Sequence, residues 1–381
     1  MTGRAGPIIA RQLSLGSLMA AQNHNGTSFP ADLAERLTTR PQWLSWLLVA
    51  GLTVLVGLFA FSDVRELWRV ARSLDVRFLA FPFACALLSY VAMARSYQGI
   101  AWAAGIQVPF WEMLKVTFVA NSVNYLITTG GLSGFAVRMF FFIRMGMRSG
   151  TAVTVSLVQT FVTNVVLLFF VVGGFYYLIR THELRGLTLV VIPLLLVLFS
   201  VATLITVFLL SHRQLRRRTL FVLAELAHWV FQRVAPRHKP RRVRIWRFQR
   251  NLDRGIEFLL SRKRHMMGPV FWIVVDWIVT LYILYTAFLC VGTTVPLTFV
   301  VVGFAVGIVL SLVSFIPGGL GVMEGSMAAI FAGLGVPFET AVVAVLVFRA
   351  AYYLLPLLIS VFFFRNMMAQ TAEARLVLEE S

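Results

Sequence analysis

The sequence predicts an all-α, polytopic integral membrane protein, and its composition carries most of that prediction. Of the 381 residues, 59% are hydrophobic and 13% are charged, and the mean hydropathy is +0.82. A soluble domain has about 25% charged residues and about 45–50% apolar ones. The apolar residues also gather in runs long enough to cross a bilayer. This composition excludes a soluble globular enzyme, a fibrous protein and a disordered chain.

Six apolar runs are long enough to be full membrane spans, because a hydrocarbon core of about 30 Å takes about 20 helical residues. They belong to one transmembrane domain, 41–365. We expect a flexible cytoplasmic tail at 1–40 and a cytoplasmic C-terminal tail at 366–381. The six predicted spans are 43–61, 78–94, 151–179, 187–210, 268–291 and 338–364.

Two further apolar regions, 110–145 and 297–334, are interrupted at membrane depth. The first contains TTGGLSG at 128–134 and the second PGGLG at 317–321. Glycine supplies unusual backbone angles and proline removes a hydrogen-bond donor, so each cluster ends a helix. Because each arm is too short to span comfortably, we predict two re-entrant helix–loop–helix pairs, which need protein or water around the broken backbone. The alternative is a tight turn that joins two short helices at the membrane surface.

The polar stretch 211–265 is the one sizeable extramembrane segment that the sequence predicts. It holds 16 Arg or Lys residues against Glu225, Asp253 and Glu257. The positive-inside rule places it in the cytoplasm, and counting spans from it places both termini on the same side. Apolar residues at helical spacing indicate a basic amphipathic hairpin on an anionic lipid surface, with a solvated loop as the alternative. A soluble chain this basic would suggest nucleic acid, but in a membrane protein we expect none.

The two interrupted regions resemble each other. GGL at 130–132 matches GGL at 318–320, and TAV at 151–153 matches TAV at 340–342, so the offset is 188 and then 189. Three predicted spans lie between the copies, an odd number, so we expect the copies to be inverted relative to each other. Inverted repeats with broken helices are the usual architecture of secondary transporters, with the substrate site between the repeats.

Several of these residues resemble a known family. PGGLGVME at 317–324 is similar to the signature of the lysylphosphatidylglycerol synthase transmembrane (flippase-like) family. Asn124, followed by the Gly-Gly turn and Arg138, resembles the first motif of that family, and Arg95 resembles its basic residue after the second span. The resemblance covers roughly 43–364. It implies a flippase-like membrane protein that moves lipid.

The chain departs from the family pattern in its first half. Thr129 stands in place of the proline of the first turn, and the acidic residue near Phe135 is absent. Gln159, Thr160 and Asn164 stand where the family has Glu, Arg and Asp. The sequence also leaves no room for the soluble lysyl-transferase domain of some members, so we do not expect lysylphosphatidylglycerol synthesis.

Ionisable residues at membrane depth are costly and mark functional sites by default. Here they are Arg138, Asp276, Glu324 and Arg349. Each also has a structural alternative. Glu324 can stabilise a helix N-terminus, Arg138 can pair with it, and Asp276 can pair with Arg349. With the motif residues, the predicted substrate-binding set is Asn124, Gly130, Gly131, Arg138, Asp276, Pro317, Gly318, Gly319, Gly321, Glu324 and Arg349.

The sequence contains no hydrolase triad, phosphate loop, nucleotide fingerprint or metal cluster, so we expect no catalytic residue, metal or cofactor. Cys85 and Cys290 lie in apolar runs and imply no disulfide. The GxxxG pair Gly303 and Gly307 indicates close helix packing rather than a ligand.

The leading hypothesis is a flippase-like protein of the bacterial inner membrane that translocates an anionic or glycosylated phospholipid. The first alternative is an integral-membrane enzyme, or an accessory subunit, in envelope lipid or glycolipid assembly. The second is a structural partner without transport of its own. Membrane lipid is the expected partner, and a partner enzyme or a second copy of the chain stays open.

Overall fold

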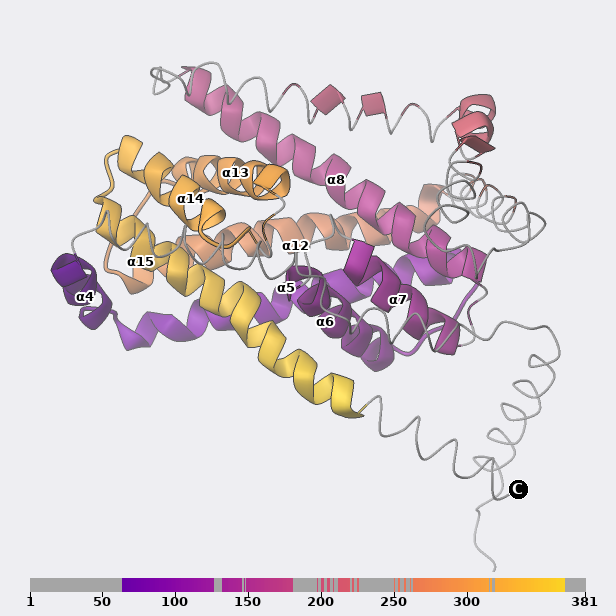
Figure 1. The fold of residues 1–381 in the computed structure, drawn as a ribbon, viewed down its shortest axis with the longest axis horizontal. Helices are drawn as coiled ribbons and strands as arrows, with labels where there is room; N and C mark the ends of the chain where they lie inside the picture. The colour runs from indigo at the N-terminus through magenta and orange to yellow at the C-terminus, as the bar shows by residue number, and fades with distance from the viewer. Residues whose placement is uncertain are drawn as a thin grey trace, which may run out of the picture. The chain divides into compact units, whose positions relative to one another are not determined.

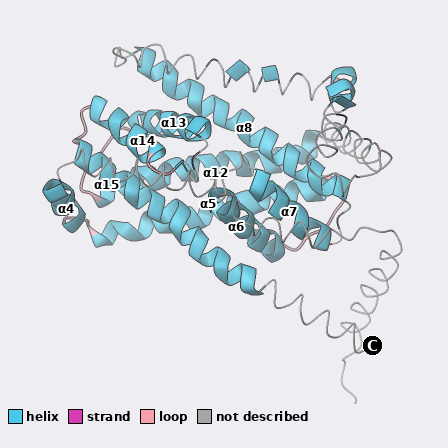
Figure 2. Ribbon diagram, viewed as in Figure 1, coloured by secondary structure: helices cyan, strands magenta, loops and turns pink. Residues whose placement is uncertain are grey.

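The computed structural model describes residues 64–126, 132–180 apart from 146 and 148, 263–314, 316 and 319–366, with scattered positions between 197 and 261. Every element in these residues is a helix (Figures 1 and 2). The all-α prediction is therefore confirmed for the part of the chain that the structure describes.

Four of the described helices are long and apolar enough to cross a membrane. They are Val76–Ala103, Gly150–Gly174, Arg264–Cys290 and Phe338–Asn366. They coincide with four of the six predicted spans. The predicted span 43–61 lies outside the described residues, as do most positions of 187–210, so the count of six stays a prediction.

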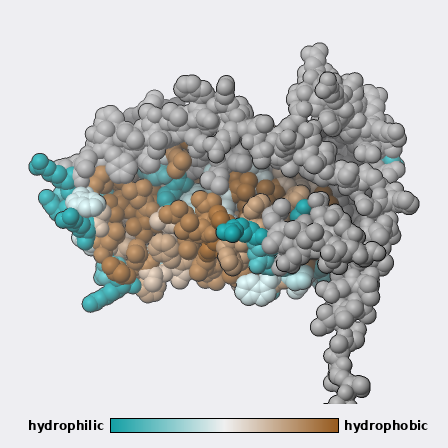
Figure 3. Space-filling model, turned by 60° about the horizontal axis from the view of Figure 1, so that its bottom comes forward, coloured by the Kyte–Doolittle hydropathy of each residue, from teal (hydrophilic) through white to brown (hydrophobic). Residues whose placement is uncertain are grey.

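The outer faces of these helices carry large apolar side chains. Figure 3 shows a broad apolar surface on one face of the described residues. Such a surface on a monomeric soluble protein is rare, and lipid tails are the environment that suits it. Exposed members on the long helices include Phe81, Leu88, Phe169, Phe271, Leu358 and Phe362.

The centre of the fold is an antiparallel pair of long helices, α5 (Val76–Ala103) and α12 (Lys263–Cys290), each of 28 residues. Near one end of the pair, the backbone N–H of Asp75 donates to the carbonyl of Cys290 at 2.9 Å. Near the other end, a Cβ added to Gly99 would lie 2.8 Å from Cγ of Pro269. Contacts at both ends show that the two helices pack along most of their length.

Both interrupted regions fold as two short helices, as the Gly and Pro clusters predicted. The first forms α6 (Phe110–Leu126) and α7 (Leu132–Arg144), and the second forms α13 (Leu297–Ser314) and α14 (Val322–Gly333). In each region the two short helices pack against each other. Only α13, with 18 residues, approaches the length of a full span.

Glycines let these short helices approach closely. A Cβ on Gly134 of α7 would lie 2.7 Å from Cβ of Asn124 on α6. On α13, a Cβ on Gly303 would lie 2.5 Å from the Phe331 ring of α14, and one on Gly307 would collide with Met327. The prediction that Gly303 and Gly307 mark close helix packing is confirmed.

The element order is the same in both halves of the described chain. Helices α5, α6, α7 and α8 (Ser149–Arg180) run long, short, short, long. Helices α12, α13, α14 and α15 (Phe338–Arg349) repeat that order, since α15 continues through a π-helical turn, η3 (Ala350–Leu354), into a helix that reaches Asn366. A short helix, α4 (Val64–Arg72), precedes the first half.

Two apolar clusters form the core, and each is centred on one half. One gathers the C-terminal part of α5 with α6, α7 and the start of α8. The other gathers α12, α13, α14 and α15 with the later part of α8. Buried polar side chains lie within each half and, at Ser89 and Asp276, between α5 and α12, and they form the candidate site.

Candidate functional site in the membrane domain

A buried ion pair joins α14 to α15. Nε of Arg349 donates to Oε1 of Glu324 at 2.6 Å, and the two side chains are 9% and 4% exposed. Glu324 stands in the first turn of α14, just after Gly321, whose φ of +78° suits glycine. The break before α14 therefore aims the carboxylate at the last residue of α15, and the helix N-terminus adds favourable charge.

Each member of this pair keeps one polar atom without a partner. Oε2 of Glu324 and Nη2 of Arg349 are buried and make no hydrogen bond within the described residues. A buried polar atom without a partner costs about 1–3 kcal/mol, and more when it belongs to a charged group. Here Oε2 of Glu324 is an acceptor and Nη2 of Arg349 is a donor. A polar ligand that carries both a donor and an acceptor could form the two missing hydrogen bonds.

Arg349 is followed at once by the π-helical turn η3, and a short distance later by Pro356. Proline has no N–H to continue the usual ladder, and single π-helical turns recur at functional sites. The turn holds Tyr352 and Tyr353. The guanidinium of Arg349 lies 4.2 Å from the centroid of the Tyr353 ring.

A cluster of tyrosines surrounds this turn. The ring of Tyr125 on α6 lies 4.4 Å from that of Tyr353, centroid to centroid. The ring of Tyr90 on α5 lies 6.5 Å from that of Tyr352. The Tyr90 hydroxyl is buried and has no hydrogen-bond partner in the part of the chain that the structure describes. The cluster therefore brings hydroxyl groups from the first half of the chain beside the ion pair of the second half.

Arg138 on α7 has different partners from the predicted one. Its Nη1 donates to the Tyr97 hydroxyl on α5 and, at 3.4 Å, to Oδ1 of Asn121 on α6. Its Nε is buried without a partner. The expected alternative of a pair with Glu324 is not what the structure shows, because both atoms that Arg138 contacts are neutral.

Asp276 on α12 also differs from expectation, because it does not pair with Arg349. Its Oδ1 accepts a hydrogen bond from the hydroxyl of Ser89 on α5. Thr280, one turn further along α12, has its hydroxyl 3.5 Å from that of Ser89. Asp276 and Ser89 are 7% and 0% exposed.

Some of the predicted motif residues lie in the described part of the chain and others lie outside it. Asn124 is half-buried with an unpartnered Oδ1 beside Gly134. Gly319 has a φ of +62°, and a Cβ there would collide with the Ser311 side chain, so its small size is explained by packing on α13. Four predicted site residues lie outside the described residues: Gly130, Gly131, Pro317 and Gly318.

Sequence reasoning missed the uncharged partners of the site. Ser89, Tyr97 and Asn121 are uncharged and look ordinary in an apolar run, yet they hold Asp276 and Arg138. Ser89 and Asp276 stand at the midpoints of α5 and α12, but the predicted spans 78–94 and 268–291 have other midpoints, so the apolar runs alone did not pair them. Arg95, singled out by its motif, is exposed above the Phe110 ring and lies outside the buried set.

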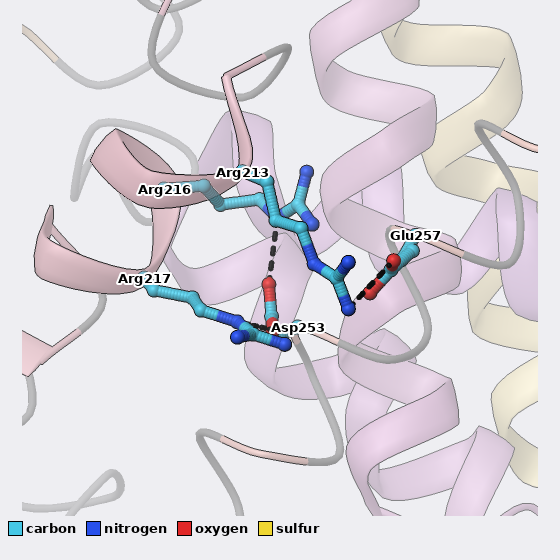
Figure 4. Close-up of polar contacts among 5 residues, drawn as sticks. All are labelled: Arg213, Arg216, Arg217, Asp253 and Glu257. Carbon is cyan, nitrogen blue, oxygen red and sulfur yellow. Dashed lines mark hydrogen bonds and ion pairs between the residues drawn. The ribbon is translucent and has the colours of Figure 1, made fainter.

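The basic segment between the halves is held by ion pairs (Figure 4). Oδ1 and Oδ2 of Asp253 accept from Nε of Arg216 at 2.7 Å and from Nε of Arg217 at 2.9 Å. Arg213 and Glu257 pair at 3.1 Å. Burial raises the pKa of the Asp253 carboxyl, but hydrogen bonds from the two arginines outweigh this and hold the pKa below its ordinary value. Among the described residues, 213 pairs with 257 and 216 and 217 pair with 253, which is an antiparallel order.

Long apolar helices, a lipid-facing surface and a buried set of charged groups define a multi-pass helical membrane protein. The model of the lysylphosphatidylglycerol synthase TM region matches residues 45–360. The chain belongs to that family, as the motif resemblance predicted.

Three proteins with similar sequences are also identified. A UPF0104 membrane protein of Pyrococcus horikoshii is 21% identical over 317 residues, covering 82% of this chain and 94% of that protein. A UPF0104 membrane protein of Methanothermobacter thermautotrophicus is 24% identical over 327 residues, 83% of this chain and 90% of that one. A phosphatidylglycerol lysyltransferase of Staphylococcus haemolyticus is 34% identical over 85 residues, 22% of this chain and 10% of that protein.

Proposed function

We propose that this protein translocates a phospholipid with an anionic or glycosylated headgroup across the bacterial inner membrane. The observation that carries the proposal is the buried Glu324–Arg349 pair, which leaves an acceptor and a donor atom unsatisfied inside the membrane domain. Ionisable groups at membrane depth are costly to bury and mark a transport or binding site by default. Family membership, in a membrane region named for lipid synthesis, supports lipid as the substrate.

The arrangement of helices supports an inverted repeat, the second part of the proposal. The helices α5–α8 and the helices α12–α15 follow the same order of long and short members. The first helices of the two sets, α5 and α12, pack antiparallel. If α5 corresponds to α12, the two halves are related by a twofold axis in the membrane plane. Transporters with such repeats bind their substrate near the midplane, between the repeats.

We propose that the headgroup is held by arginine from one half and by the ion pair from the other. Arg138 has a free Nε and Arg349 a free Nη2, and guanidinium groups bind phosphate oxygens with directed hydrogen bonds. The unpartnered Oε2 of Glu324 would accept from a headgroup hydroxyl or ammonium. Asn124, with its own unpartnered Oδ1, would add a second acceptor.

The proposed orientation has the basic segment 211–265 and both termini in the cytoplasm, with the segment lying on anionic lipid. The charge of the segment supports this placement. Labelling of single cysteines from outside should reach position 183 and miss positions 240 and 375. External labelling at position 240 would reverse the orientation.

The test of function uses purified protein in vesicles of phosphatidylcholine and phosphatidylglycerol that carry fluorescent phosphatidylglycerol. A membrane-impermeant reductant reports the fraction of label that changes leaflet. We expect protein-dependent movement, and a loss of about 10-fold or more in the Arg138→Ala and Glu324→Gln variants, because each removes a charged contact worth about 1.5–3 kcal/mol.

The matched control is Arg180→Ala. Arg180 is an exposed arginine at the end of α8 that contacts the Tyr176 hydroxyl at 3.2 Å. The Arg180→Ala variant should translocate lipid at the same rate as the unmodified protein. If the site variants are well folded and also move lipid normally, the headgroup site lies elsewhere. If the unmodified protein moves neither this lipid nor a glycosylated one, the proposed function is wrong.

A further inference from the structure

Asp276 occupies a central position between the two halves of the molecule. It lies at the midpoint of α12, and its hydrogen-bond donor Ser89 lies at the midpoint of α5. In an antiparallel pair of equal helices, the two midpoints face each other across any twofold axis that relates them. The Ser89–Asp276 contact therefore lies where one half would move against the other.

The surroundings of Asp276 contain hydroxyl groups and no neighbouring cation within the described residues. Ser89 bonds to it and Thr280 lies next to Ser89. The titratable groups that face it from other helices are phenols. They are Tyr90 and Tyr97 on α5, Tyr125 on α6 and Tyr352 in η3.

The charged residues on the helices around Asp276 are engaged elsewhere or stand at helix ends. Arg349 of α15 bonds to Glu324, and Arg95 of α5 bonds to Gln98. Helix α13 has no charged residue. The others lie in first or last turns: Arg77 of α5, Arg180 of α8, Glu339 of α15, and Lys263, Arg264 and His265 of α12.

A carboxyl group in this setting is more stable neutral than charged. An isolated carboxylate in an apolar interior is so costly that the group takes up a proton instead. The contrast within this protein is Asp253, whose carboxylate is held by two arginines. Among the described residues, Asp276 has a hydroxyl partner, Ser89, and a hydroxyl can serve a protonated carboxyl as well as an ionised one.

We propose that Asp276 is a proton-binding site that couples lipid movement to proton flow through the interface of α5 and α12. The inference rests on the proposed function, and it removes Asp276 from the headgroup ligands. In the arrangement that the structure shows, with α5 and α12 packed together, the carboxyl is protonated; we call this the closed arrangement. Release breaks the carboxyl O–H bond, leaves its electron pair on the oxygen and passes the proton to water.

The consequence of release is mechanical. The carboxylate left behind needs more donors or water than the closed interface offers. The hydroxyl of Tyr90, next to Ser89 on α5, is buried and has no hydrogen-bond partner among the described residues, so it is a donor that the closed interface does not use. Recruiting it, or admitting water, requires α5 to shift against α12, which is the kind of packed interface that switches between two discrete arrangements.

The first measurement detects the proton directly and needs no transport. Infrared spectra of the purified protein in detergent should show the band of a buried protonated carboxyl group, which disappears as the pH is raised. The Asp276→Asn variant should lack this band. Ser89→Ala should shift it, because the hydrogen bond to the carboxyl is lost. The control Glu112→Gln should leave it unchanged, since Glu112 is half-exposed and pairs with Lys115 at 2.8 Å.

The second measurement is lipid movement in the same fluorescent phosphatidylglycerol vesicles under a pH gradient. A gradient of one pH unit should change the ratio of inward to outward rates by up to about tenfold for one proton per lipid. Asp276→Asn should move lipid at a rate that no longer responds to the gradient. Glu112→Gln should respond like the unmodified protein.

The outcomes separate the two proposals. A missing carboxyl band overturns the proton site, and so does a band that persists in Asp276→Asn. Lipid movement that ignores the gradient in the unmodified protein overturns the coupling and leaves the proposed function standing. No lipid movement at all defeats the proposed function, and the infrared titration then decides the proton site alone. If Asp276→Asn fails to fold, Ser89→Ala and the unmodified protein still give the infrared answer.

Discussion

The two halves of this protein share a scaffold and differ in charge. At the offset of 188, Glu324 of α14 corresponds to Ala136 of α7, and at 189 Arg349 of α15 corresponds to Thr160 of α8. The second half therefore has a buried ion pair where the first has an alanine and a threonine. In the first half the neighbouring Gln159 accepts a hydrogen bond from Ser96 of α5 at 2.7 Å.

The first half has a charge of its own at a different place. Arg138 of α7 corresponds to Ser326 of α14 at the offset of 188, and its partners among the described residues are the neutral oxygens of Tyr97 and Asn121. The two halves therefore share the order of long and short helices and the close glycine contacts, while their polar groups differ. A ligand between the halves would meet an arginine on one side and a balanced pair on the other.

The largest expected effect comes from breaking the pair in the second half. Arg349→Ala leaves Glu324 buried and uncompensated, which costs about 3–5 kcal/mol. In the first half, Gln159→Leu leaves only the Ser96 hydroxyl without its partner, at a cost of about 1–3 kcal/mol. Unfolding of both variants in detergent, followed by circular dichroism against denaturant, measures the difference.

A double variant separates structure from function at this pair. Replacing both partners by apolar residues of similar size, Glu324→Leu with Arg349→Met, removes two buried charges together and should recover most of the lost stability. The same protein should stay inactive in lipid movement. A double variant as unstable as Arg349→Ala would mean that the pair is needed for the fold.

The glycines should affect both halves alike. A Cβ at Gly303 meets the Phe331 ring, and one at Gly134 meets Asn124 and the carbonyl of Ala120 at 2.8 Å. Overpacking of this kind costs about 1–3 kcal/mol, so Gly303→Ala and Gly134→Ala should each lower the unfolding midpoint. Gly134→Ala should cost more, because a backbone carbonyl yields less than a ring.

Gly333→Ala is the control, because nothing lies within 4 Å of a Cβ there. It stands at the end of α14, so its effect should stay below that of the two packed glycines. Equal losses in all three variants would show that helix propensity, rather than the close contact of the short helices, sets the cost.

Sequence patterns predicted the helices and the charged residues of the site. They did not predict which side chains these charged residues contact. Apolar run length predicted four described spans, and glycine clusters predicted where α6 and α13 end. Their position within long apolar runs predicted that Asp276 and Arg349 are buried, and both are. Which groups they contact depends on the antiparallel register of α5 and α12 and on the π-helical turn at 350–354, and neither follows from local periodicity. The uncharged partners carry no such signal.

The smallest effects are expected in the segment that joins the halves, and they distinguish a folded hairpin from a solvated loop. Arg216 is 3% exposed and Arg217 55% exposed, although both bond to Asp253. Arg216→Ala should therefore destabilise the hairpin clearly, whereas Arg217→Ala should change stability by about 0.2–1 kcal/mol, the usual value of an exposed pair. Hydrogen exchange of the backbone amides in 211–265 measures both variants.

The pH dependence of the ion pairs in the same segment has a definite sign. The folded pKa of Asp253 lies below its ordinary value, so its stabilising contribution is complete above the unfolded pKa of about 3.9. That contribution is lost as the pH falls through the folded pKa. Amide protection in the hairpin should thus be constant from neutral pH down to about pH 5 and decline below about pH 4. Asp253→Asn should remove that decline and lower protection at neutral pH. Protection equal in Asp253→Asn and the unmodified protein at neutral pH would mean that the halves are joined by a solvated loop, and that the ion pairs at 213–257 do not organise it.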